Sequence, residues 1–279
     1  MSRQGQRSEK HRLKFDVNTL RDAIMGNVPL FEELDEIYKY KMLCGEALHI
    51  TERRMFSIIT RTWNPITGCT HNCSYCWARR LAAGRLKRSK RYREGFKPRL
   101  NVQELRVKFK RNEVVFVSDM GDMFCEGVPD EWIEAVLSVI AKFPQTSFLL
   151  LTKNPARYLN FEFPANVLLG ATIETDRDEI TAELSDAPPP SERIVAMRNL
   201  RHPHKFVSIE PVLDFTRKFA DEIAAIEPEI VYIGYDNYNN KLREPQLRKV
   251  LSLINALGHY NVCLRVKTIR RAWYEERGI

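Results

Sequence analysis

The chain has 279 residues, of which 44% are hydrophobic, so it is long enough for one large α/β domain or two ordinary domains. No apolar run approaches the ~18 residues that span a bilayer, and the polar first ten residues lack the apolar stretch of a secretory signal. We therefore expect a cytoplasmic protein that contacts no membrane. In a reducing compartment its six cysteines favour metal binding over disulfides, and its net charge of +8 favours binding of a polyanion.

The first 50 residues are expected to form a basic tail and a helical extension. Residues 1–15 are polar and basic, which is typical of a disordered tail. Two helices are predicted over residues 17–48, with a break at the Gly-Asn-Val-Pro sequence of residues 26–29. Residues 51–279 are expected to form one α/β domain.

Seven short apolar runs, separated by stretches with a helical pattern, make up this domain. The runs are rich in β-branched residues and show no polar alternation, which is typical of strands buried on both faces of a parallel sheet. Among the intervening stretches, residues 130–143 and 242–257 are amphipathic at helical spacing. Strand–helix alternation over this length predicts a parallel α/β barrel or partial barrel. The runs are residues 56–60, 114–118, 147–152, 167–173, 205–210, 230–234 and 262–266.

Three cysteines, Cys69, Cys73 and Cys76, lie within eight residues after the first predicted strand. Their spacing is C-x3-C-x2-C, with an aromatic residue, Tyr75, before the third cysteine, and a helix is predicted over residues 74–86. Three thiolates on one loop can hold three irons of a cubane iron–sulfur cluster, whereas a cluster that only carries electrons is normally closed by four cysteines. An open fourth iron implies that a small molecule binds there, as an open position does at a catalytic zinc.

Two other interpretations of this loop stay open. His71 can join the three cysteines in a zinc site, although structural zinc sites usually draw a second pair of ligands from a distant segment. Cys73 and Cys76 alone can form a redox pair, but that interpretation leaves Cys69 without a role. The open iron–sulfur cluster accounts for all three cysteines, and it is the interpretation that we prefer.

Most of the positive charge lies in one segment. Residues 79–111 contain 14 lysines and arginines and two glutamates, a charge of 14 − 2 = +12, which leaves about −4 for the rest. Such a segment attracts phosphate backbones, and the interleaved Tyr92 and Phe96 favour a nucleic-acid interface over a merely solvated helix face. The residues expected to contact nucleic acid are Arg85, Lys87, Arg88, Lys90, Arg91 and Arg93.

Polar or charged residues follow nearly every predicted strand. Active sites of parallel barrels lie at the carboxyl ends of the strands, and loops of purely structural origin less often place a charge after nearly every strand. We therefore regard these residues as candidate site residues. They are Ser118, Asp119, Asp122, Lys153, Glu174, Glu210 and Arg265.

The cysteine motif resembles that of the radical S-adenosylmethionine (SAM) superfamily. The blocks at residues 63–82, 118–124, 150–157 and 208–213 are similar to a short, often phage-associated branch of that superfamily. The resemblance implies a partial (β/α)6 barrel of the TIM type over residues 51–279, preceded by the helical extension. Cys125 stands where a histidine is expected in this branch.

The resemblance also implies a role for the candidate residues. Cys69, Cys73 and Cys76 would ligate a 4Fe-4S cluster whose open iron binds the amino and carboxylate groups of SAM, and the backbone around Tyr75 would approach the adenine. The Ser118–Asp122 loop would accept a hydrogen bond from the SAM ammonium, through Asp119 or Asp122. Ribose would be held by Glu174 or Glu210, and a carboxylate or phosphate by Lys153 or Arg265. An ordinary salt bridge is the alternative for each charged residue.

The implied chemistry is reductive cleavage of SAM. An electron from a flavodoxin-like or ferredoxin-like donor would yield methionine and a 5′-deoxyadenosyl radical, which removes a hydrogen atom from the substrate. Cys125 is a candidate catalytic thiol that returns a hydrogen atom, as a thiol does in radical lyases that repair thymine photoproducts. Cys263, on the last predicted strand, is a weaker candidate. Burial as a small hydrophobic residue is the alternative for both.

The basic segment favours a nucleic acid or nucleotide as the substrate of a modification or lyase-type reaction. Two alternatives remain: a radical SAM enzyme that acts on a peptide or small molecule, and a non-catalytic nucleic-acid-binding protein with a structural metal.

Overall fold

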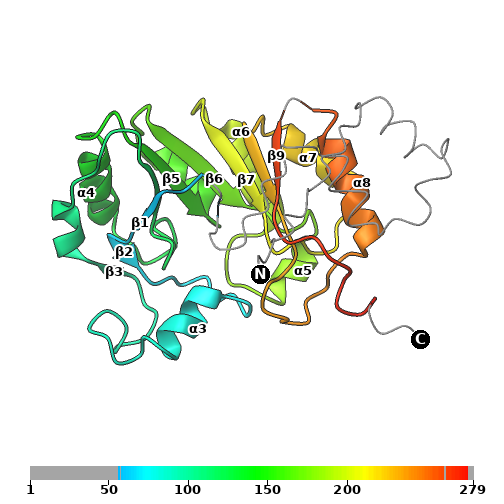
Figure 1. Cartoon of the computed structure of the whole chain (residues 1–279), viewed down its shortest axis with the longest axis horizontal. Coiled ribbons are helices and arrows are strands. Elements are labelled where there is room, and N and C mark those ends of the chain that lie inside the picture. The colour runs from blue at the N-terminus through cyan, green and yellow to red at the C-terminus, as the bar shows by residue number, and fades with distance from the viewer. Residues whose placement is uncertain (1–55, 57, 261, 276–279) are drawn as a thin grey trace, which may run out of the picture. The chain divides into compact units, whose positions relative to one another are not determined.

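A computed structural model describes residues 56, 58–260 and 262–275 of the chain. Its main feature is a seven-stranded sheet in which every neighbouring pair of strands is parallel (Figure 1). The strands lie side by side in chain order, β1-β4-β5-β6-β7-β8-β9, so each connection leads to the next strand. The tail and helical extension predicted for residues 1–50 lie outside the described residues.

The strands of this sheet are short. They are β1 (Arg61–Trp63), β4 (Val114–Val117), β5 (Ser147–Thr152), β6 (Val167–Thr172), β7 (Lys205–Ile209), β8 (Ile230–Ile233) and β9 (Cys263–Val266). Two further strands form a small antiparallel pair, β2 (Ile66–Thr67) with β3 (Arg99–Leu100). The helices are α3 (Trp77–Ala83), α4 (Asp130–Ile140), α5 (Asp178–Ala182), α6 (Pro190–Asn199), α7 (Phe219–Ala224) and α8 (Leu247–Leu257), with 3-10 turns at Val102–Arg106 and Pro155–Asn160.

Six of the seven predicted strands are confirmed to within a residue or so at each end, and the first is wrong. The strand beside β4 is residues 61–63, whereas the apolar run that begins at Phe56 precedes it. Phe56 is buried and packs edge to face against Phe116 and Phe206, with ring centroids 5.3 and 5.7 Å apart. The run is apolar because it covers the core, not because it belongs to the sheet.

The same aromatic cluster reveals the curvature of the sheet. The Phe56 ring contacts Phe116 on β4 and, at a centroid distance of 4.4 Å, Tyr232 on β8, although β5, β6 and β7 lie between these strands. The sheet therefore bends around this cluster, in which Leu149 and Phe206 are also buried.

Amphipathic helices complete the packing. α4 buries Ile133, Val136 and Ile140, as the predicted helix over residues 130–143 requires. α8 begins at Leu247, five residues after the start predicted from the apolar pattern, and residues 242–246 form a loop before it. No helix within the described ranges is long and apolar enough to cross a bilayer.

Candidate functional site

The cysteine loop connects β2 to α3 and lies against the loop that follows β4. Gly68, at the start of the cysteine loop, has φ +85°, and a Cβ atom there would lie 2.0 Å from the carbonyl oxygen of Lys97. The Gly68 amide donates to the carbonyl of Met120 (3.0 Å), and the Gly68 carbonyl accepts from the Asp122 amide (3.2 Å). Only glycine allows this close approach of two backbones.

Two of the three cysteine sulfurs accept backbone hydrogen bonds. Cys69 Sγ accepts from the His71 amide (3.3 Å), and Cys76 Sγ caps α3 by accepting from the Arg79 amide (3.3 Å). The predicted helix therefore begins at Trp77 rather than at residue 74. Such N–H···S bonds stabilise negative charge on sulfur. The third sulfur, of Cys73, is buried and lies 3.1 Å from the Ser185 hydroxyl.

The surroundings disfavour free thiolates. Burial raises the pKa of Cys73, although the positive charge of Lys153 opposes the shift. A hydrogen bond with Cys125, together with burial, raises the pKa of Cys69. Without a bound cation these thiols stay protonated at neutral pH, so metal binding would release protons.

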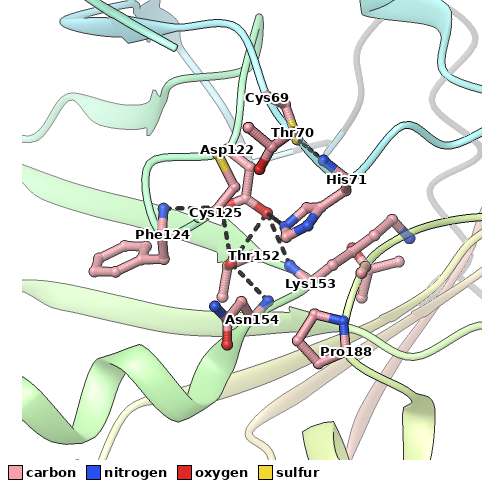
Figure 2. Close-up of polar contacts among 12 residues, drawn as sticks. Cys69, Thr70, His71, Asp122, Phe124, Cys125, Thr152, Lys153, Asn154 and Pro188 are labelled. Carbon is pink, nitrogen blue, oxygen red and sulfur yellow. Dashed lines mark hydrogen bonds and ion pairs between the residues drawn. The ribbon is translucent and has the colours of Figure 1, made fainter. Parts of the chain in front are cut away.

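A buried His–Asp pair joins the cysteine loop to the loop that follows β4. His71 Nε2 and Asp122 Oδ2 are 2.9 Å apart, and neither side chain reaches solvent appreciably (Figure 2). Asp122 also accepts hydrogen bonds from the Thr152 hydroxyl (2.8 Å) and from the amides of Lys153 and Phe124 (2.9 Å each). Burial alone would raise the pKa of Asp122, but His71 and these hydrogen bonds outweigh it and lower the pKa. Asp122 thus joins the cysteine loop to the end of β5.

This arrangement bears on the zinc interpretation. Possible ligand atoms of Cys69, His71 and Asp122 lie within 4.8 Å of one another. A metal at that point would have to replace the His71–Asp122 hydrogen bond. It would also leave Cys76, which faces the start of α3, out of the ligand set.

A second buried carboxylate, Glu174, follows β6 and is 0% exposed. It accepts a hydrogen bond from the Tyr75 hydroxyl and forms ion pairs with Lys153 and with Arg193, whose Nη1 is 2.7 Å away. Burial alone would raise the pKa of Glu174, but the charges of Lys153 and Arg193 outweigh it and lower the pKa to about 2. This network ties the cysteine loop to β5, β6 and α6.

Other predicted site residues have fewer protein contacts. Asp119 accepts a 2.5 Å hydrogen bond from Asn64, and burial raises the pKa of its carboxyl group. Ser118 has φ +58°, and its buried hydroxyl has no hydrogen-bond partner among the described residues. Glu210 forms an ion pair with Lys267 and is half-buried.

The two other cysteines among the described residues differ in position. Cys125 is fully buried next to Cys69 (Figure 2), whereas Cys263 is exposed at the start of β9, so the weaker candidate does not point inward. Arg265 lies within β9 rather than after it and is half-buried.

The basic segment agrees only in part with its prediction. All six predicted contact residues are exposed, in a run of turns after α3 rather than on a helix face. Tyr92, in contrast, is 6% exposed and packs with Ala78 and Ala82 of α3, while the half-buried Phe96 lies against Tyr92 at a centroid distance of 6.3 Å. These aromatic rings pack in the core beneath α3, so the interpretation of Tyr92 and Phe96 as surface residues that stack on nucleic acid is wrong.

Sequence reasoning missed two residues of this region. Arg193, the buried partner of Glu174, lies on a helix that gives no sequence signal of a site. Tyr238 lies in the loop after β8 and is 54% exposed, with the Arg80 guanidinium 4.9 Å from its ring centroid. The asparagine-rich sequence around Tyr238 marks a turn, but not the exposure of the ring.

Comparisons with known proteins agree with this fold. The family described as "Protein of unknown function (DUF5131)" matches residues 55–231, and no curated protein matches the sequence. A solved spore photoproduct lyase variant with bound AdoMet and dinucleoside spore photoproduct gives a TM-score of 0.53 at 10% identity, covering 89% of this chain and 93% of that chain. A spore photoproduct lyase complexed with dinucleoside spore photoproduct gives 0.51 at 10% identity, over 90% and 94% of the two chains.

A radical SAM methyltransferase from Sphaerobacter thermophilus is a more remote match. It gives a TM-score of 0.46 at 16% identity and covers 76% of this chain and 67% of that chain. At identities this low, the likeness establishes the fold alone: a parallel α/β fold shared with solved radical SAM enzymes.

Proposed function

The chain belongs to the family described as "Protein of unknown function (DUF5131)", and we propose that it is a radical SAM enzyme that acts on a nucleic acid or nucleotide. Cys69, Cys73 and Cys76 would hold its 4Fe-4S cluster. The observation that carries the proposal is the position of three thiols on one loop at the carboxyl end of a parallel sheet whose fold matches solved radical SAM enzymes. The curvature of the sheet supports the partial (β/α)6 barrel as its architecture.

The donor set fits such a cluster. Three thiols lie on one tight loop, and two of their sulfurs accept backbone N–H groups that would stabilise iron-bound thiolates. The burial that disfavours a free thiolate at Cys73 would be offset by the positive charge of iron. When bound and reduced, the cluster would supply the electron that cleaves SAM to methionine and a 5′-deoxyadenosyl radical.

The number of protein hydrogen bonds at each acidic residue distinguishes those that would position the cysteine loop from those that would bind SAM. Asp122 and Glu174 are saturated by protein donors, so we assign to them the positioning of the cysteine loop. Asp119, which has one side-chain donor, and the unpartnered Ser118 hydroxyl are better suited to the SAM ammonium. Glu210 is half-buried and better suited than Glu174 to ribose hydroxyls.

The surroundings of Lys153 and Cys125 support the roles that we propose for them. The Lys153 ammonium is bound to Glu174 and lies 5.4 Å from the Tyr75 ring centroid, beside the cysteine loop. Cys125 is buried against Cys69, where its thiol would be shielded from water. A hydrogen atom passed from this thiol to a carbon-centred substrate radical would form a C–H bond and leave a thiyl radical on Cys125. Arg265 is kept as a second candidate for a substrate carboxylate or phosphate.

A polyanionic substrate is supported by the exposed basic residues beside α3. The two spore photoproduct lyase structures, which share the fold, contain a dinucleoside photoproduct. We therefore propose base modification or a lyase-type reaction, with a flavodoxin-like or ferredoxin-like protein of the cytoplasm as the electron donor.

An anaerobic assay tests the proposal. The protein is reconstituted with iron and sulfide, reduced with dithionite and supplied with SAM, and 5′-deoxyadenosine is measured by mass spectrometry. We expect iron binding and 5′-deoxyadenosine formation, both lost in Cys73→Ala and retained in the control Cys263→Ala, which alters an exposed thiol. Zinc in place of iron, without cleavage of SAM, would instead indicate a metal-stabilised binding protein.

A further inference from the structure

An exposed aromatic ring lies close to the cysteine loop and takes no part in the ion pairs described above. Tyr238 is 54% exposed and belongs to the loop after β8, at the carboxyl end of the sheet. The guanidinium of Arg80 lies 4.9 Å from the ring centroid. Arg80 is on α3, four residues after Cys76, and its amide donates to the Cys76 carbonyl (3.2 Å). Tyr238 therefore contacts α3, the helix that directly follows the cysteine loop.

The loop that carries this ring is held in shape by hydrogen bonds. The buried carboxylate of Asp236 accepts from both the backbone amide and the side-chain amide of Asn240, each at 2.7 Å. The Thr268 hydroxyl donates to Asn237 (2.5 Å), and Arg80 donates to the Asn240 side chain (2.8 Å). The ring is thus presented to solvent by a braced loop, and a ligand that stacks on it loses little binding energy to loop ordering.

The surroundings indicate the chemistry of the ligand. The segment of +12 charge begins at Arg79 and continues in the exposed residues that follow α3, so the ligand is a polyanion. An exposed aromatic ring next to a guanidinium suits a flat π-system, and each base of a nucleic acid offers one. A base within a duplex already has both faces stacked, so the ring suits an unpaired base.

We propose that Tyr238, backed by Arg80, is a stacking platform for an unpaired nucleobase next to the cysteine loop. This inference rests on the proposed function and narrows its substrate to a nucleic acid with at least one base outside the helical stack. The buried Tyr92 and the half-buried Phe96, which packs against it, do not offer such a surface. Tyr260, another exposed tyrosine, lies between α8 and β9 at the opposite end of the sheet.

Fluorescence anisotropy of the reconstituted protein, without SAM, tests the platform. The probes are a labelled oligothymidylate of about 12 nucleotides, the matching oligouridylate and a strand of equal length composed of abasic sites. Tyr238→Ala should weaken binding of the base-bearing strands by about tenfold and leave binding of the abasic strand unchanged. Tyr238→Phe, which keeps the ring, and the control Tyr260→Ala should bind as the wild type does.

The abasic strand separates base stacking from phosphate contact, and it also reports whether the variant is folded. Wild-type affinity for oligothymidylate in Tyr238→Ala, or an equal loss of affinity on the abasic strand, would overturn the platform. If the wild-type protein cleaves SAM but binds none of the strands, both the platform and the nucleic-acid part of the proposed function fail, while the radical SAM assignment stands. The thymidylate and uridylate arms distinguish DNA from RNA as the source of the base.

Discussion

The ion-pair network around Glu174 allows a worked prediction about stability. Glu174→Gln keeps the size of the side chain and removes its charge. Arg193, whose side chain is 0% exposed, and the largely buried Lys153 then lose their counter-charge. Because a buried cation without a partner is costly, we expect a large loss of stability in the protein without bound SAM.

Two estimates of the magnitude agree. Lowering the pKa of Glu174 from 4.5 to about 2 corresponds to roughly 3 kcal/mol at neutral pH, at about 1.4 kcal/mol per pH unit. Breaking a buried ion pair by removing one partner typically costs about 3–5 kcal/mol. A loss of roughly 3 kcal/mol lowers the Tm of a domain of this size by roughly 6–12 °C.

The pH dependence has a definite sign. Since the folded-state pKa lies below the unfolded-state pKa, this stabilisation is complete above about pH 4.5 and is lost as the pH falls towards 2. The Tm difference between wild type and Glu174→Gln should therefore be full at pH 7 and shrink below about pH 4.5. Thermal unfolding followed by circular dichroism at several pH values measures it.

A matched control is Glu179→Gln. Glu179 is also paired with an arginine, Arg177, but its side chain is 61% exposed, so this variant should melt with the wild type. The reasoning is refuted if Glu174→Gln melts within about 2 °C of the wild type at pH 7, or if the difference in Tm does not change in acid. Unchanged stability together with weaker SAM binding would instead support the ribose role for Glu174.

Three further predictions concern the cysteine loop and the basic segment. Gly68→Ala should lose bound iron, because its Cβ would clash with the Lys97 carbonyl. The control Gly95→Ala should keep its iron, because Gly95 has a similar φ of +91° but a Cβ there would have no neighbouring atom within 4 Å. Equal iron contents in the two variants would contradict the clash argument. Cys125→Ala should still form 5′-deoxyadenosine but change the substrate product, and identical products would discard the donor role. Charge reversal at Arg88 and Arg91 should weaken polynucleotide binding and lower its salt dependence by about two phosphate contacts. The binding constant measured at several salt concentrations checks this. If its dependence on salt is unchanged, neither arginine contacts the polynucleotide.

Most of the sheet could be predicted from the sequence because buried parallel strands are continuous apolar runs bounded by polar turns. The run at residues 56–60 shows the limit of this signal. Its apolar pattern indicates a buried segment, and Phe56 is indeed buried. A segment that packs against the curved sheet has the same apolar pattern as a strand within the sheet, so the pattern cannot distinguish the two. Tyr92 shows the same ambiguity, since an aromatic residue among arginines is compatible with either a surface or a core position.

Features with a local signal can be read from the amino-acid order alone: the spacing of three cysteines, the glycine before them, the charge that follows and the strand–helix alternation. Long-range contacts in the folded chain establish which carboxylates already have protein donors and which aromatic rings are exposed. Asp122 bonds to His71, 51 residues away, and Glu174 bonds to Tyr75, 99 residues away. Tyr238 is turned outward beside Arg80 of a distant helix. Such partners are chosen by the folding of the chain in three dimensions, so no local pattern records them.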